Sequence, residues 1–160
     1  MPNRLQLIAL PDIPLVQPGD DLPDLIAASL ERAGEALQDG DVLVIAQKIV
    51  SKSEDRYADL DDVKPSVRAV ELGEKTDKDP RLVDLILSES REVLRHRPGV
   101  LIVAHRLGYV LANAGIDSSN VAPQNDGQRV LLLPVDPDRT CAELRAAMKE
   151  RFGKNTAIVI

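Results

Sequence analysis

The chain has 160 residues, of which 44% are hydrophobic and 29% charged, as expected for a soluble globular protein that buries a core. Its formal net charge of −6 argues against a general nucleic-acid binder, which needs a basic face to neutralise phosphates. The single cysteine, Cys141, excludes an internal disulfide, and no apolar run approaches the roughly 20 residues that cross a bilayer. We therefore expect a cytoplasmic protein that is not bound to a membrane.

The hydrophobic pattern predicts strands that alternate with helices, and hence an α/β fold with a mixed sheet and flanking helices in a single domain over residues 1–160. In chain order, we expect a strand at Leu5–Leu10, then a helix that Asp20 or Asp21 caps and whose apolar face begins at Leu22, and then a strand buried on both faces at the start of Asp41–Val50. A helix at Pro80–Arg97 would be capped by Asp79 and stop before Pro98 and Gly99. Strands follow at Val100–Ala104 and Tyr109–Ala112, which would pair across "HRLG", and at Arg129–Leu133. The last elements are a helix at Cys141–Phe152 with one apolar face, which begins with a Thr140–Glu143 capping box, and a strand at Ala157–Ile160.

The segment "LANAGIDSSNV", Leu111–Val121, combines small residues with potential oxygen ligands. Small residues let the backbone approach a ligand closely, and Asp117 and Asn120 offer the hard oxygen atoms that a phosphate-bound cation uses. The alternative interpretation is a tight connection that an Asx turn stabilises. From the spacing alone, both interpretations stay open.

The segment "QKIVSKSE", Gln47–Glu54, places Lys48 and Lys52 just after a predicted strand. These lysines indicate either a solvated edge or a phosphate clamp at the ligand-binding side of an α/β sheet. Neither common glycine-rich nucleotide fingerprint occurs. His96 is interpreted as a cation at a helix C-terminus, His105 as a site candidate, and Cys141 as a core residue and not a nucleophile.

Four segments, taken together and in this order, resemble one family along the whole chain: "LPDIPLVQPGDDL", "DGDVLVIAQKIVSKSE", "HRLGYVLANAGIDSSNV" and "LLLPVDPDRT". They are similar to the N-terminal part of the γ-glutamyl ligases that act on the deazaflavin coenzyme F420. The resemblance implies an unusual α/β topology, a homodimer, and GTP-dependent ligation of L-glutamate to the lactyl carboxylate of the unglutamylated deazaflavin. It also implies Mg or Mn as the divalent cation, with potassium as a possible activator.

The same resemblance implies roles for individual residues. Asp117 would bind the divalent metal, and Lys52 and Asn120 would contact GTP. The segment formed by Ile13, Pro14, Leu15 and Val16 would contact GTP as well, and Gln47 would lie against the nucleotide. No catalytic residue is assigned.

This chain also departs from the family pattern. Asp55 stands where the family usually has Gly, which would matter if the position needs a positive φ. Family members continue after "AIVI" with a further half that completes the site, so we expect residues 1–160 to be an incomplete, inactive N-terminal portion of a ligase, truncated after a terminal strand. The alternative is a non-catalytic remnant that binds a nucleotide or a partner.

Overall fold

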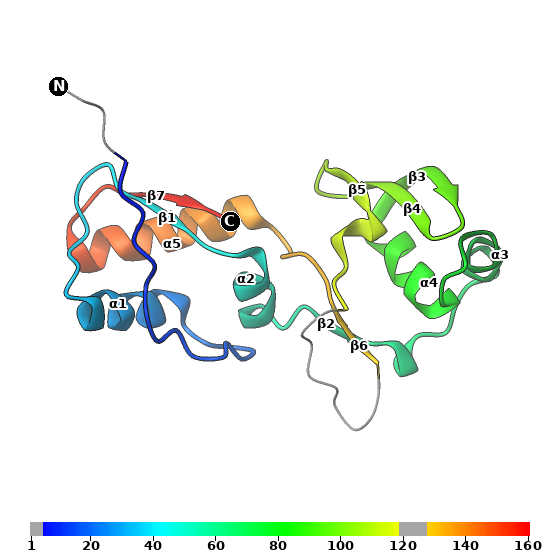
Figure 1. Cartoon of the computed structure of the whole chain (residues 1–160), viewed down its shortest axis with the longest axis horizontal. Helices are drawn as coiled ribbons and strands as arrows, with labels where there is room; N and C mark the ends of the chain where they lie inside the picture. Colours follow the sequence, from blue (N-terminus) through cyan, green and yellow to red (C-terminus); the bar gives the residue numbers. More distant parts are fainter. Residues whose placement is uncertain (1–4, 119–127) are drawn as a thin grey trace. The chain divides into compact units, whose positions relative to one another are not determined.

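The computed structural model describes residues 5–118 and 128–160 and shows a mixed α/β protein (Figure 1), which confirms the predicted fold class. The chain forms two compact units: unit 1 comprises Met1–Asp55 with Pro137–Ile160, and unit 2 comprises Arg56–Asp136. Strands of the described residues form three small sheets. The single domain over 1–160 stays a prediction, because two such units can belong to one domain.

Unit 1 is built around a parallel pair of strands. Its elements are α1 (Leu22–Ala33), β1 (Val42–Val44), α2 (Gln47–Ser53), α5 (Pro137–Phe152) and β7 (Ala157–Val159). β1 and β7 run side by side (Figure 1), with Leu43 opposite Ile158. As predicted, Asp21 caps α1, since its carboxylate accepts a hydrogen bond from the Asp24 N–H at 2.9 Å.

Helices α1 and α5 cover one face of the β1–β7 pair. Leu43 and Ile158 pack against a buried cluster whose members come from α1, α5 and the segment after α1: Ile26, Leu30, Leu37 and Met148. A second cluster joins Val16, Leu22, Val50 and Leu144. The predicted apolar faces of the two helices are therefore confirmed at their centres.

The described residues of unit 2 form two antiparallel sheets and two α-helices. Its elements are β2 (Tyr57–Asp59), the 3-10 turn η1 (Leu60–Asp62), α3 (Val67–Thr76), α4 (Pro80–Ser88), β3 (Ser90–Arg97), β4 (Val100–His105), β5 (Val110–Ala112), the 3-10 turn η2 (Asn113–Gly115) and β6 (Arg129–Leu131). One sheet has the order β3–β4–β5 and the other pairs β2 with β6. The predicted pairing across "HRLG" is confirmed by the register Val103 to Leu111.

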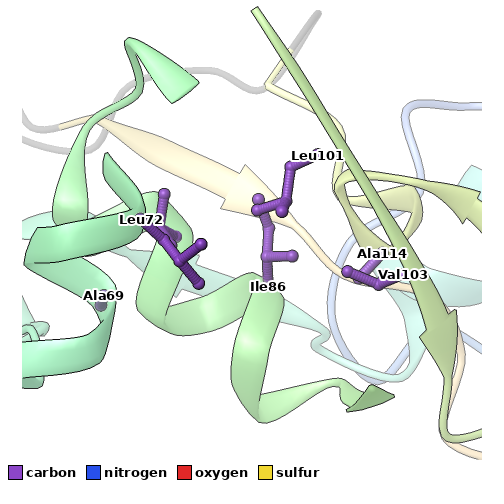
Figure 2. Packing of buried hydrophobic residues seen from close by; sticks show 7 residues of the cluster. Ala69, Leu72, Ile86, Leu101, Val103 and Ala114 are labelled. Atoms are coloured by element: carbon purple, nitrogen blue, oxygen red, sulfur yellow. The ribbon is translucent and has the colours of Figure 1, made fainter. Parts of the chain in front are cut away.

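The core of unit 2 lies between its helices and the three-stranded sheet. Figure 2 shows Ile86 of α4 directed toward Leu101 of β4, with Val103 next to Ala114. Ile86, Leu101, Val103 and Ala114 are all fully buried. This packing fixes η2, and with it the start of the segment that carries Asp117.

The predicted helix at Pro80–Arg97 is wrong in its second half. Asp79 caps α4 as expected, but α4 ends at Ser88 and the chain continues as strand β3. Pro98 and Gly99 form the turn between β3 and β4, and Gly99 has φ +77°. A proline followed by a glycine with positive φ is typical of a type II turn. His96 therefore lies on a strand and is not a helix C-terminal cation.

Three other predicted elements need correction. Leu5–Leu10 forms no strand, and Leu5 and Leu7 are each 86% exposed. The segment Asp41–Val50 starts as a three-residue strand whose Val44 is 75% exposed, so it is not buried on both faces. Helix α5 begins at Pro137 instead of Cys141, and the Thr140 hydroxyl donates to Glu54 Oε1 at 2.7 Å instead of forming a capping box.

Candidate functional site

Helix α2 carries two of the residues expected to contact a nucleotide. Gln47 is its first residue, and its side-chain amide donates a hydrogen bond to the hydroxyl of the buried Ser51. Lys52 lies in its last turn and is half-buried. Within residues 5–118 and 128–160, the Lys52 ammonium forms no ion pair. Lys52 thus has a positive charge that the described chain does not neutralise, which suits an anionic ligand.

The segment Ile13–Val16 is anchored next to α2. Val16 is only 2% exposed and packs in the cluster that contains Val50 of α2. Three residues later, the Gly19 N–H donates to the Ser53 carbonyl at 2.9 Å. Ile13 to Leu15 stay exposed. The structure therefore brings Ile13–Val16 and α2 together within unit 1, although they are far apart in the sequence.

Asp117 lies in unit 2 and is held by its backbone. Its N–H donates to the Leu131 carbonyl at 3.0 Å, and its carbonyl accepts from the Leu131 N–H at 2.8 Å. The residue is half-buried, and the carboxylate oxygen Oδ2 has almost no exposed area. Asn120, the other candidate from this segment, lies outside the described residues. The proposed roles of Asp117 and Asn120 stay predictions.

The small residues before Asp117 are explained by the packing of the chain itself. Asn113, Ala114 and Gly115 have φ values of +52°, +53° and +69°, in the left-handed region that favours glycine and tolerates asparagine. A Cβ atom on Gly115 would lie 2.8 Å from Leu111 Cδ1 and 3.0 Å from Leu133 Cδ1. These three residues therefore support the interpretation as a tight connection. Asp55 also has a positive φ, of +52°, at the position where glycine was expected.

A buried charged cluster in unit 2 was missed by the sequence interpretation. Glu89 accepts hydrogen bonds from Arg56 Nη2 at 3.0 Å and from Arg106 Nε at 2.9 Å, and its Oε2 lies 3.5 Å from His105 Nε2. Its side chain is only 11% exposed and that of His105 is fully buried. Arg56 and Glu89 are 33 residues apart, so no local pattern links them. The cluster joins the start of β2, the end of α4 and the β4–β5 turn.

The titration of this cluster follows from its burial and charges. Burial alone would raise the pKa of Glu89, but hydrogen bonds and charge from Arg106 and Arg56 outweigh it and lower the pKa below its usual value. Burial lowers the pKa of His105, and the Glu89 charge offsets only part of this effect. His105 Nδ1 accepts a hydrogen bond from the Leu107 N–H at 3.0 Å. His105 is therefore neutral near pH 7 and holds a hairpin turn, as a structural residue would.

A pocket of about 510 Å³ opens in unit 1 beside β7 and the first half of α5. Its lining includes Cys141, Arg145, Thr156 and Ala157. Burial, followed by the charge of Asp138, raises the pKa of the Cys141 thiol, which disfavours the thiolate that a nucleophile needs. Cys141 is half-buried at the edge of this pocket, so the prediction that it belongs to the core is only partly correct.

Two further findings concern the described residues as a whole. No group of three or more His, Cys, Asp or Glu side chains in the described ranges is placed to hold a metal ion. None of the described helices combines the length and the apolar character that crossing a membrane requires.

Comparison with known proteins gives one consistent result. Residues 12–160 match the family model described as F420-0:Gamma-glutamyl ligase. The chain is 42% identical over 156 residues to the coenzyme F420:L-glutamate ligase of Methanothermobacter thermautotrophicus and 43% identical over 159 residues to that of Methanopyrus kandleri. Each alignment covers 98% of this chain but 60% of the relative. The ligase of Archaeoglobus fulgidus is 38% identical, with 59% of its length covered.

Proposed function

Because the chain belongs to the F420-0:γ-glutamyl ligase family, we propose that it forms part of an enzyme that uses GTP to join L-glutamate to the unglutamylated coenzyme F420. The observation that carries this proposal is the 42% identity to a coenzyme F420:L-glutamate ligase across 98% of the chain. The chain spans about 60% of the length of the relatives that it matches. The complete activity is therefore proposed for a polypeptide that also contains the remaining part.

The proposed reaction has two balanced steps. An oxygen of the lactyl carboxylate attacks the γ-phosphorus of GTP, the bond to the β-phosphate oxygen breaks, and GDP leaves. This forms an acyl phosphate. The neutral amine of L-glutamate then attacks the acyl carbon, phosphate leaves with the electrons of the C–O bond, and the nitrogen loses a proton. Phosphoryl transfer of this kind depends mainly on positioning and on neutralising phosphate charge.

We assign the nucleotide side of the reaction to unit 1. Lys52 would neutralise phosphate charge, since its half-buried ammonium has no ion-pair partner among the described residues. The exposed residues Ile13–Leu15, which Val16 anchors beside α2, would contact GTP. Gln47 would contribute an amide group from α2. Asn120, which lies outside the described residues, is proposed as a further GTP contact on the family resemblance alone. The proximity of Ile13–Val16 to α2 supports this assignment because the family resemblance implicates both segments.

We assign Asp117 to the divalent cation, Mg or Mn, that accompanies GTP. A carboxylate is a suitable hard ligand for either ion, and the backbone pairing with Leu131 fixes the position of Asp117. The cation would supply positive charge next to the phosphates. Asp117 would be only one of its ligands, with phosphate oxygens and the remaining part of the ligase completing the set. Potassium is proposed as an additional activator.

The reaction is tested with a chimera, in which the part of the Methanothermobacter ligase outside the alignment is joined to Ile160. The chimera is incubated with GTP, Mn²⁺, L-glutamate and the unglutamylated deazaflavin, and the product is identified by mass. We expect the addition of glutamate with release of GDP. A chimera that folds and binds GTP but forms no glutamylated product would contradict the proposed function.

The role of Lys52 is tested by nucleotide binding to the same chimera. We expect Lys52→Met to weaken GTP binding about 10-fold or more, since a charge-assisted hydrogen bond contributes roughly 1.5–3 kcal/mol. The matched control is Lys149→Met on the exposed face of α5, which should leave GTP binding unchanged. Equal binding by both variants would remove Lys52 from the nucleotide site.

A further inference from the structure

The β1–β7 pair has an apolar face that no described residue of unit 1 covers. Val42 and Val44 of β1 and Ala157 and Val159 of β7 project from the face opposite to Leu43 and Ile158. Val42 is 54% exposed, Val44 75% and Val159 48%. We call these four residues, Val42, Val44, Ala157 and Val159, the outer face. In the register of the two strands, Val44 lies beside Val159 and Val42 lies beside Ala157, so the apolar surface is continuous.

An exposed outer face is unusual for strands that pair in parallel. Parallel strands occur almost only in sheets that are covered on both faces. In unit 1, α1 and α5 cover the inner face through the cluster around Met148. The apolar segment at Leu5–Leu10 does not cover the outer face, because Leu5 and Leu7 are each 86% exposed. The described residues of unit 1 therefore supply no cover for the outer face.

Thr156 gives a second, independent indication of a missing neighbour. This residue directly precedes β7, is only 3% exposed, and its hydroxyl has no hydrogen-bond partner among the described residues. Buried hydroxyl groups are normally satisfied. The other buried threonine, Thr76, shows the usual situation, since its hydroxyl donates to the Leu72 carbonyl at 2.6 Å. Thr156 lines the pocket beside α5, and Ala157 belongs both to that pocket and to the outer face.

We propose that the outer face and the pocket around Thr156 form one docking surface for the remaining part of the ligase polypeptide. This inference rests on the proposed function, because the relatives are longer by about two-fifths of their own length than the region they share with this chain. The docked segment packs apolar side chains on Val42, Val44 and Val159. It also places a polar group within hydrogen-bonding distance of the Thr156 hydroxyl.

The apolar part of the proposal is tested by thermal unfolding of the isolated chain and of the chimera, in the absence of GTP. We expect Val44→Asp to shift the Tm of the isolated chain by less than about 2 °C. In the chimera, the same variant buries an unpaired charge and should lower Tm by about 10 °C. Val67→Asp is the matched control, since Val67 is 77% exposed and lies on α3 of unit 2. It should have a small effect in both proteins.

The polar part is tested with two valine variants. Thr156→Val removes a hydroxyl that has no partner in the described chain, so the Tm of the isolated chain should stay the same or rise. In the chimera, the variant leaves the partner group unsatisfied and should lower Tm by about 3–6 °C. Thr76→Val, the control, removes an existing hydrogen bond and should lower Tm equally in both proteins.

The outcomes separate this inference from the proposed function. If Val44→Asp and Val67→Asp shift the Tm of the chimera equally, the outer face is not the docking surface. If light scattering shows that the isolated chain is a dimer which Val44→Asp dissociates, while the chimera does not respond to Val44→Asp, the occupant is a second copy and the proposal is wrong. A chimera without ligase activity that still responds selectively to Val44→Asp contradicts the proposed reaction and supports the docking surface.

Discussion

The imidazole of His105 faces the carboxylate of Glu89, with Nε2 of His105 3.5 Å from Oε2 of Glu89 in the interior of unit 2. The other ring nitrogen, Nδ1, accepts a hydrogen bond from the Leu107 N–H. Nδ1 must therefore lack a proton, and the single proton of the neutral ring lies on Nε2, on the side of Glu89. Protonation would break the hydrogen bond to Leu107 at the turn between β4 and β5.

This relationship predicts that unit 2 loses stability in acid. The folded pKa of His105 is lowered from 6.5. The contribution of neutral His105 to the free energy of unfolding is therefore complete above about pH 6.5 and decreases as the pH falls toward the folded pKa. The folded pKa of Glu89 is lowered from 4.5, so a second loss follows below about pH 4.5 as Glu89 becomes protonated. We expect the free energy of unfolding, measured with urea, to fall between pH 7.5 and 5.5.

The two histidines of the chain provide a control for this prediction. His105→Asn removes the titrating ring and should flatten the change in unfolding free energy between pH 7.5 and 5.5. His96→Asn alters an exposed residue of β3 and should leave the pH dependence as it is. A pH dependence that disappears in the His96 variant and persists in the His105 variant would contradict the assignment.

Glu89 is predicted to be the most sensitive ionic residue of unit 2. Glu89→Gln leaves the guanidinium groups of Arg56 and Arg106 without their buried counter-charge. Breaking a buried pair in this way costs about 3–5 kcal/mol. The comparison is Glu143→Gln, because Glu143 pairs with Arg139 at the surface, where the side chains are 62% and 74% exposed, and should cost less than about 0.5 kcal/mol. Urea unfolding of both variants measures the difference.

Gly115 is predicted to be required for packing as well as for its backbone conformation. Gly115→Ala combines a positive φ with a Cβ atom 2.8 Å from Leu111 Cδ1, and should destabilise the chain by about 2–4 kcal/mol. Gly108→Ala is the control, since Gly108 has φ +92° but no atom within 4 Å of the position that the alanine methyl group would take. It should cost only the backbone term of about 1–2 kcal/mol. Equal losses of unfolding free energy would show that the contact with Leu111 is unimportant.

The fold class and several elements could be predicted from the sequence because they depend on local patterns. The cap of α1 at Asp21, the pairing of β4 with β5 and the strand at β7 all follow from residues close together in the chain. The error at Pro80–Arg97 arose because the apolar spacing of α4 continues by chance into β3. The turn at Pro98 and Gly99 was interpreted as a helix stop instead of a hairpin.

The elements and contacts that could not be predicted depend on residues far apart in the chain. Leu5–Leu10 has the composition of a strand, but a strand forms only beside a neighbour. Glu89 contacts two arginines and one histidine from other parts of unit 2, and no sequence motif has the spacing that separates these residues. The site candidates were found by family resemblance. Spacing alone left Asp117 and Lys52 with alternative interpretations.

Asp117 is predicted to be needed for the response to a divalent cation. Asp117→Asn in the chimera removes the negative charge that binds the cation. The Mn²⁺ concentration needed for the half-maximal rate of glutamate ligation should rise about 100-fold, since a single carboxylate ligand contributes several kcal/mol to a site of this kind. The control is Asp77→Asn at the end of α3, where asparagine tolerates the φ of +54°. Mn²⁺ titrations of the initial rate compare the two. An unchanged Mn²⁺ requirement in Asp117→Asn would exclude this residue as a ligand.

The isolated 160-residue chain is predicted to have no measurable ligase turnover, whereas the chimera should be active. Asp117 is the only metal ligand assigned within the chain, and the described residues contain no cluster of three or more potential metal-binding side chains. Phosphoryl transfer needs all the groups that neutralise the phosphate charge to be present and already in position. Lys52 and Ile13–Val16 should nevertheless leave weak GTP binding, which isothermal titration calorimetry can detect. If the isolated chain forms glutamylated product at a rate comparable to that of the chimera, the remaining part of the ligase is dispensable and the proposed division of the site is wrong.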